Sequence, residues 1–162
     1  MHHTLLAHND FRNPLIIKGG THDFVNNVVY DWGVLAAEIA DYDSNSFLNF
    51  VGNSFLPGPS TQQGAYEIQI GTDGGTPQLY VEGNVGPHRP TPDADEWSLV
   101  KLGWGHDGVA PAKYRSQTPY ATPAVTKSDA TEAMESVLTE TGATLPQRDA
   151  VDRRVVAEVR NR

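Results

Sequence analysis

The stretch LNFVGNSFL at residues 48–56 places a few apolar residues before an asparagine, and this pattern recurs along the chain. DFVNNVVY at 23–30 and LYVEGNV at 79–85 repeat it, and LLAHND at 5–10 is a weaker copy. Alignment of the copies puts four asparagines in register, Asn9, Asn27, Asn53 and Asn84. A repeat of about 20–30 residues with one β-like run per copy is typical of a stacked solenoid. Asparagine suits the corners, because it tolerates left-handed φ and its amide can bond along the stack.

Further strands are predicted from apolar runs and alternation between turn residues. The segment VLAAEIA at 34–40 is too short to separate a helix from a strand, and residues 86–112 are expected to be mostly loop. The predicted strands are 4–7, 15–17, 23–30, 66–70 and 78–82, with a strand pair at 47–55 around Gly52-Asn53.

Two helices are predicted near the C-terminus. Ser128 is expected to cap a helix that runs to about residue 141 and ends at Gly142, and Asp149 to cap a second one. The second helix places four valines on one face, Val151, Val155, Val156 and Val159. We therefore expect two parts, stacked coils over 1–117 and an extension over 118–162 whose helices pack on the coils and shield an open end.

Composition excludes some partners. The net charge of −8 argues against binding to nucleic acid or to an anionic membrane. No apolar run approaches the roughly 20 residues of a membrane span. The chain has no cysteine, so a disulfide framework is excluded. The start, MHHTLLAHND, lacks the basic flank and long apolar run of a signal peptide.

Three segments together point to a family. They are HHTLLAHNDFRNPLIIKGG at 2–20, DFVNNVVYDWG at 23–33 and NFVGNSFLPGPST at 49–61. In this combination the chain resembles the pectate lyase family of right-handed parallel β-helix enzymes, closely over residues 1–61 and loosely over 64–117. The segment 118–162 looks like the C-terminal end of bacterial members. The resemblance implies an all-β fold, a truncated right-handed parallel β-helix (solenoid) with a short α-helical C-terminal tail.

The resemblance also implies that coils are missing. Family members are usually much longer, with several coils before the HH segment, so this chain looks like their C-terminal part. Those coils carry most of the acidic calcium ligands, and the calcium cofactor is therefore expected to be held mainly outside this chain. Extracellular or periplasmic localisation is implied by the family. Loss of the coils would leave residues 4–7 as an open strand edge, from which we expect self-association.

The implied activity is lyase cleavage of polygalacturonate, an acidic polysaccharide, by β-elimination. The resemblance assigns the base that removes the C5 proton to Arg12 of the RNP motif. An arginine is an awkward base, because its ordinary pKa is above 12. Two other roles stay open: a charged clamp for a substrate carboxylate, and an exposed loop arginine paired with Asp10.

Two further residues are assigned to substrate binding by the same resemblance, Lys18 and Asn13. Lys18 stands near the family's second basic position, with Leu15 where many relatives carry arginine. The alternative for Lys18 is a solvated lysine at the end of a strand.

Other motifs are weaker. His2 and His3 invite a metal-binding interpretation, but adjacent strand residues point to opposite faces, which favours a structural role for the HH pair. The acidic runs around Asp41, Asp43 and Asp73, and around Asp93, Asp95 and Glu96, lack the full pattern of a calcium loop. Trp32, Trp97 and Trp104 could stack on sugars, although core packing is favoured for at least two of them.

A different class of function stays open beside the lyase. The alternative is a non-catalytic carbohydrate-binding or structural remnant of the β-helix. A coding segment in frame upstream, with acidic ligand motifs, would favour the lyase, and its absence the remnant.

Overall fold

A computed structural model describes residues 1–162 except 41–45, 72–74, 104–105 and 107–108. The described residues form ten strands, two 3-10 helices and two α-helices. The strands are β1 (Leu5–Ala7), β2 (Leu15–Ile16), β3 (Gly20–Val25), β4 (Val28–Tyr30), β5 (Leu35–Ile39), β6 (Ser46–Val51), β7 (Ser54–Leu56), β8 (Tyr66–Ile70), β9 (Gln78–Glu82) and β10 (Val100–Leu102). The helices are η1 (Glu96–Leu99), η2 (Pro111–Lys113), α1 (Ala130–Glu140) and α2 (Ala150–Arg160).

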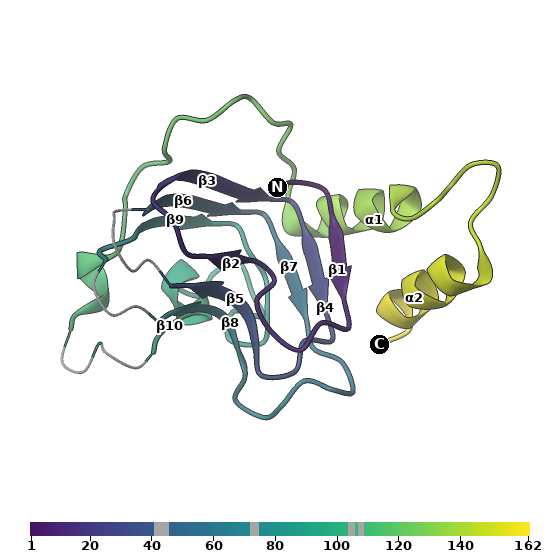
Figure 1. The fold of residues 1–162 in the computed structure, drawn as a ribbon, viewed down its shortest axis with the longest axis horizontal. Helices are drawn as coiled ribbons and strands as arrows, with labels where there is room; N and C mark the ends of the chain where they lie inside the picture. Colours follow the sequence, from purple (N-terminus) through teal and green to yellow (C-terminus); the bar gives the residue numbers. More distant parts are fainter. Residues whose placement is uncertain (41–45, 72–74, 104–105, 107–108) are drawn as a thin grey trace.

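The described strands pair in parallel within three short sheets, ordered β1-β4-β7, β10-β8-β5-β2 and β3-β6-β9 (Figure 1). All three sheets contribute to one apolar cluster, for example Phe24, Val29, Ile39, Phe50 and Ile68. Large aromatic and β-branched side chains therefore fill the space that the sheets share, and this burial is the main stabilising contribution.

The fold class predicted from the sequence is wrong in this respect. A truncated right-handed parallel β-helix of stacked coils was expected, whereas the described residues form three separate short sheets and two α-helices of 11 residues each. The strands are only two to six residues long, and the sheets hold three, four and three of them. The asparagine repeat marks only the corner between the sheet β3-β6-β9 and the sheet β1-β4-β7. It therefore does not specify the structure of the whole chain.

That corner splits the predicted strand 23–30 into β3 and β4, because Asn26 adopts a left-handed conformation with φ of 52°. Next to it, the side chains of Asn27, Asn53 and Asn84 form a buried stack. Nδ2 of Asn27 donates to Oδ1 of Asn53 at 3.1 Å, and Nδ2 of Asn53 donates to Oδ1 of Asn84 at 2.7 Å.

The fourth predicted member of the stack, Asn9, lies elsewhere. The pairing of Leu5 with Val28 places Thr4 beside Asn27, and the Thr4 N–H donates to Oδ1 of Asn27 at 3.1 Å. Asn9 is exposed in the loop that follows β1. The alignment at this copy was therefore wrong by five residues.

Other local predictions are confirmed. The bounds of β8 and β9 match the predicted strands, and the pair around Gly52-Asn53 appears as β6 and β7. The ambiguous segment 34–40 contains the strand β5, whose five residues are all buried. A continuous buried run of this length suits a strand in a parallel sheet.

Both predicted C-terminal helices exist, and only the cap of the first differs from the prediction, by one residue. Asp129 rather than Ser128 caps α1, its Oδ1 accepting from the N–H groups of Thr131 and Glu132 at 2.9 Å each. Asp149 caps α2 as predicted, accepting from the Asp152 N–H at 2.9 Å. The valine face of α2 is only partly buried.

The two helices lie beside β1, β4 and β7 (Figure 1). A second apolar cluster joins Val28, Tyr30 and Leu56 of those strands to Val137, Leu138, Val156 and Val159 of the helices. The helices thus cover one sheet, and the division of the chain at residue 117 stays a prediction.

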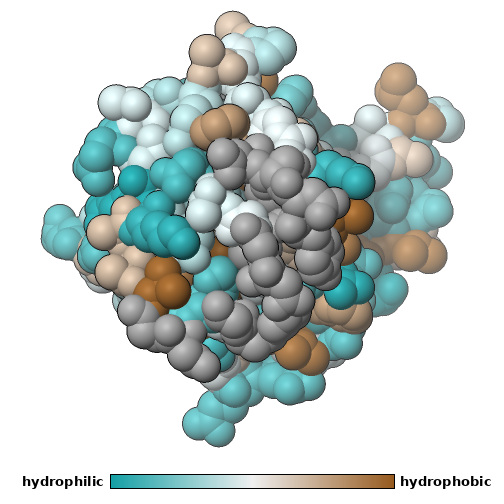
Figure 2. Space-filling model, turned by 60° about the vertical axis from the view of Figure 1, so that its left-hand side comes forward, coloured by the Kyte–Doolittle hydropathy of each residue, from teal (hydrophilic) through white to brown (hydrophobic). Residues whose placement is uncertain are grey.

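The surface seen in Figure 2 carries hydrophilic side chains interspersed with smaller apolar areas, as expected for a chain with a net charge of −8. Among the residues that the structure describes, neither helix has the length and apolar character needed to cross a bilayer.

Candidate functional site

The four-stranded sheet carries one row of side chains in register across β2, β5, β8 and β10. Leu15 pairs with Glu38, Glu38 with Gln69, and Gln69 with Lys101. Paired residues of a parallel sheet point to the same side, and successive residues alternate. The next position of each strand packs in or against the apolar cluster, as Ile39 and Ile70 do. The row therefore lies on the outer face of the sheet.

Arg12 joins this face through Glu38. Its Nε donates to Oε2 of Glu38 at 2.8 Å, with the side chains 46% and 11% exposed. The guanidinium also lies 4.6 Å from the centre of the Phe11 ring. Because the ion pair uses Nε, the terminal N–H groups of Arg12 can still donate to another anion in a bidentate fork.

The backbone at Arg12 is unusual. Phe11 pairs with Leu35, and Leu15 pairs with Glu38. The chain therefore advances four residues from Phe11 to Leu15, while its partner strand advances only three. One residue is extra, as in a β-bulge, and Arg12 has a φ of 69°. Bulges re-aim side chains and are enriched beside active sites. A left-handed conformation at a non-glycine residue is likewise a feature of functional sites.

A hollow of about 250 Å³ lies at the end of the row near Gln69 and Lys101, with Tyr66, Gln62 and Gln63 among its lining residues. The ammonium of Lys101 lies 5.2 Å from the centre of the Tyr66 ring, a cation–π contact. The hollow thus offers amide groups and a cation next to the row.

A histidine–carboxylate pair borders the same region. Glu67 is fully buried, and its two oxygens accept from the N–H and from Nδ1 of His88, at 2.9 and 2.7 Å. The His88 ring stacks on Tyr66 with centroids 3.8 Å apart. A buried carboxylate that binds Nδ1 fixes the orientation of the imidazole and directs Nε2 outward.

The two other predicted site residues are placed differently. Lys18 is exposed in the turn between β2 and β3, where its carbonyl accepts from Ser46 Oγ at 3.0 Å. Asn13 is buried, and its Nδ2 donates to the carbonyl of Asn9 at 3.3 Å. The structure brings Arg12 together with Glu38, while Asn13 serves the local backbone.

The described residues do not fit a calcium ion. No group of three or more His, Asp or Glu side chains that could hold a metal occurs among them. Asp41, Asp43 and Asp73, considered above as calcium ligands, lie outside the described residues.

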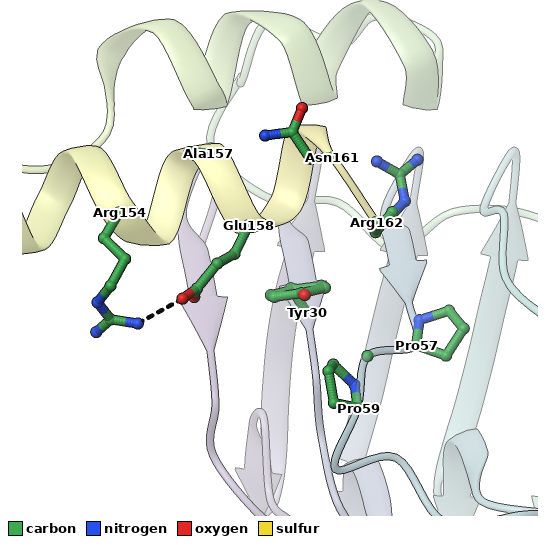
Figure 3. Close-up of a pocket in the computed structure, with 9 residues that line it drawn as sticks. Tyr30, Pro57, Pro59, Arg154, Ala157, Glu158, Asn161 and Arg162 are labelled. Carbon is green, nitrogen blue, oxygen red and sulfur yellow. Dashed lines mark hydrogen bonds and ion pairs between the residues drawn. The ribbon is translucent and has the colours of Figure 1, made fainter.

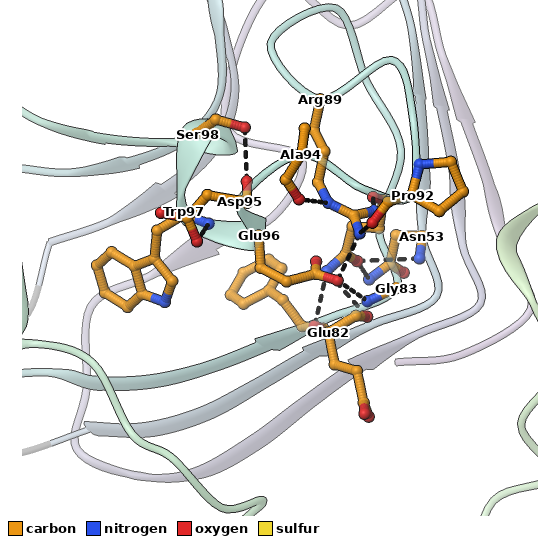
Figure 4. Close-up of polar contacts among 12 residues, drawn as sticks. Asn53, Glu82, Gly83, Arg89, Pro92, Ala94, Asp95, Glu96, Trp97 and Ser98 are labelled. Atoms are coloured by element: carbon orange, nitrogen blue, oxygen red, sulfur yellow. Dashed lines mark hydrogen bonds and ion pairs between the residues drawn. The ribbon is translucent and has the colours of Figure 1, made fainter.

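The acidic run near residue 95 has structural partners instead (Figure 4). Asp95 caps η1 and lies 3.4 Å from Arg115. Oε1 of Glu96 accepts from the Gly83 N–H and from the buried Arg89, each at 2.8 Å. These contacts hold the loop between β9 and β10 in place.

Of the three tryptophans considered as sugar platforms, Trp32 and Trp97 are buried in the apolar cluster. Trp104 lies outside the described residues.

A second concave region, of about 620 Å³, lies between α2 and the loop after β7 (Figure 3). Tyr30, Pro57 and Pro59 form its apolar wall, and Arg154 of α2 and Asn161, the C-cap of that helix, also line it. Burial raises the pKa of Tyr30, and the nearby Asp31 and Glu158 carboxylates raise it further, so its hydroxyl stays a neutral hydrogen-bonding group.

The sequence did not predict Glu38, Gln69 or Lys101 as site residues. Glu38 gave a usable signal, because it is the one charged residue in the apolar run VLAAEIA. Gln69 and Lys101 gave none without the strand register, since they lie 31 and 63 residues from Glu38 in the sequence.

No family model matches the chain. Curated relatives do: a probable pectate lyase C from Neosartorya fischeri is 34% identical over 160 residues, and the one from Aspergillus terreus is 34% identical over 163. Each alignment covers 97% of this chain and 35% of the relative. The probable pectate lyase C of Emericella nidulans is 32% identical over 160 residues, 96% of this chain and 34% of the relative. The chain therefore spans about a third of the length of these relatives.

Proposed function

Because the chain is similar to pectate lyases over nearly its whole length, as the sequence predicted, we propose that it forms part of a polysaccharide lyase that acts on an acidic polysaccharide, polygalacturonate. The observation that carries this proposal is the outer face of the four-stranded sheet, on which Arg12 is held by Glu38 beside Gln69 and Lys101. Two cations, Arg12 and Lys101, with the amide of Gln69 between them suit a polymer that bears one carboxylate on every sugar.

In β-elimination a base removes the proton from C5, the C4–O bond breaks, and a C4–C5 double bond forms. The proton passes to the base, and the departing oxygen takes a proton from solvent. Arg12 is proposed either as that base or as the clamp that binds the uronate carboxylate and stabilises the developing enolate. The ion pair with Glu38 favours the clamp, because it holds the guanidinium in a fixed orientation with Nη groups to spare.

Lys18 is proposed to bind substrate from the turn after β2, and Asn13 to support substrate binding from the loop before β2. Lys18 would act as a point charge for a second carboxylate. Asn13 is buried, so we expect its contribution to be the shape of the loop that carries Arg12.

Calcium is implied by the resemblance, and the described residues do not supply a ligand set for it. We therefore propose that its main ligands come from outside this chain. Export to the extracellular space or the periplasm is proposed on the same resemblance.

The second candidate function is carbohydrate binding without catalysis. The concave region beside Tyr30 favours it, because an apolar wall with an amide and guanidinium groups at its margin suits a sugar ring (Figure 3). The two candidates place the sugar on different elements, so they make different predictions for variants.

Titration calorimetry with oligogalacturonate, and with an uncharged oligosaccharide of equal length, tests the proposal. Arg12→Ala should weaken oligogalacturonate binding at least about tenfold, and the uncharged sugar should bind poorly. Arg154→Ala is a matched control, because Arg154 is also an exposed arginine paired with a glutamate, at 2.7 Å from Glu158. Equal affinity in wild type and Arg12→Ala, with loss in Arg154→Ala, would replace the first candidate by the second.

A further inference from the structure

His2 and His3 point toward each other. Their Nδ1 atoms are 3.1 Å apart, and the rings meet edge to face with centroids 5.3 Å apart. The expectation that these neighbours point to opposite faces is wrong, because His3 has a φ of 50° and so leaves the extended conformation. His2 forms only an isolated bridge to Val25 before the chain turns.

The separation of the two nitrogens suits one metal ion. With metal–nitrogen distances of about 2.0–2.1 Å, a 3.1 Å separation corresponds to a ligand angle of roughly 100°. That angle lies between the roughly 90° of tetragonal sites and the roughly 109° of tetrahedral sites. By this distance, the two imidazoles on adjacent residues can occupy neighbouring coordination positions of one ion.

The ring nitrogens are also available. In the described part of the chain, each Nδ1 has only the other as its partner, and neither Nε2 has a hydrogen-bond partner. The His2 side chain is exposed and that of His3 is partly exposed. An ion would take the place of this contact between the two Nδ1 atoms, and water would fill its remaining positions.

We propose that His2 and His3 form a two-histidine site for a divalent d-block ion. Imidazole ligands suit Cu(II), Ni(II) and Zn(II), and the Irving–Williams order places Cu(II) first in affinity. Calcium takes oxygen ligands, so this site is separate from the cofactor that the lyase resemblance implies. The proposal is independent of the proposed function.

Calorimetric titration with Cu(II) alone tests the site, followed by electron paramagnetic resonance of the loaded protein. The chain should carry two extra residues before Met1, so that no α-amino group lies next to the histidines. We expect one ion per chain and hyperfine structure from two imidazole nitrogens. His2→Ala and His3→Ala should each weaken binding by about tenfold or more, because each removes one arm of a chelate.

His22→Ala is the control, since His22 is a partly exposed histidine on β3 whose Nε2 lies against the Lys18 carbonyl at 3.1 Å. It should leave the affinity unchanged. Circular dichroism should show all three variants folded as the parent is. Equal affinities in the parent and in either His2→Ala or His3→Ala, a similar loss in His22→Ala, or no binding at all would overturn the proposal.

Discussion

Asn53 donates its side-chain amide to Oδ1 of Asn84 at 2.7 Å, while its own Oδ1 accepts from the backbone N–H of Asn27 at 2.8 Å. The same amide also donates to the carbonyl of Phe24 at 2.8 Å. Asn53 is fully buried. If its side chain were removed, each of these groups would lose its hydrogen-bond partner at a place that water does not reach. One side chain thereby links neighbouring strands at the corner between two sheets.

Replacement of this residue should be strongly destabilising. Asn53→Ala leaves several buried polar groups unsatisfied, and we expect the free energy of unfolding to fall by about 3 kcal/mol. Asn9→Ala, at the exposed asparagine outside the stack, should change it by less than about 0.5 kcal/mol. Urea denaturation of both variants checks this, and equal losses would contradict the role of the stack.

Acid stability should depend on Asp31. Burial alone would raise the pKa of this carboxyl, but hydrogen bonds from the Ser60 N–H, His8 and the Ser60 hydroxyl outweigh burial and lower it. A lowered folded-state pKa contributes stability that is present above the unfolded value, near 4, and is lost as pH falls through the folded value. The free energy of unfolding, measured between pH 7 and 2, should show this loss. Asp31→Asn should make the free energy of unfolding depend less steeply on pH.

Ser60→Ala offers a graded comparison for Asp31. It removes the hydroxyl bond at 3.2 Å and keeps the N–H bond at 2.6 Å. The pH dependence of the free energy of unfolding in Ser60→Ala should therefore lie between that of the parent and that of Asp31→Asn. A profile for Asp31→Asn identical to that of the parent would show that another group is responsible.

Arg12 and Lys18 should separate turnover from binding. Arg12→Lys keeps the charge but loses the fork, so oligogalacturonate binding should weaken only modestly and any formation of unsaturated uronide should disappear. Lys18→Ala should mainly weaken binding. Absorbance in the unsaturated-uronide band, with polygalacturonate and calcium, measures turnover beside the calorimetry.

The isolated chain is expected to show little or no turnover, because the described residues lack a calcium ligand set to neutralise the substrate carboxylate. Robust calcium-dependent activity of the 162-residue chain would contradict this expectation.

Self-association should occur through open strand edges. In the described sheets β1, β2 and β3 each have a neighbour on one side only, and unpaired edges can pair with another chain. Ile17, exposed just after β2, should contribute, so Ile17→Lys should reduce association in analytical ultracentrifugation. Val34→Lys is the control, since Val34 is a similarly exposed apolar residue before β5. A monomer at all concentrations would count against the edge.

Local elements could be predicted from the sequence where turn chemistry and apolar runs agree. Gly52 has a φ of 61°, which glycine adopts at no cost, and the strands on either side of it were predicted correctly. The strand 23–30 is predicted as continuous, because its residues are apolar on both sides of the corner and the repeat aligns Asn27 rather than the left-handed Asn26.

The site was only partly predictable for a related reason. The resemblance pointed to Arg12, but the partner that fixes it, Glu38, is 26 residues away, and only the pairing of β2 with β5 reveals the contact. The prediction of the overall fold class was wrong, because a repeat in the sequence indicates only which residues are neighbours. It does not report how far regular strands extend.

Asn26 also fastens the chain to itself. Its Nδ2 donates to the carbonyl of Ser128 at 2.9 Å, and its Oδ1 accepts from the Ser128 N–H at 3.0 Å. Asn49 makes the same pair of bonds to Tyr120, at 2.9 Å each. The segment between Tyr120 and Ser128 is thus a loop whose two ends are each fixed by a pair of hydrogen bonds to a buried asparagine. Because lengthening a loop costs little free energy when its ends are fixed, residues can be inserted between Tyr120 and Ser128 while both helices stay packed on the sheet.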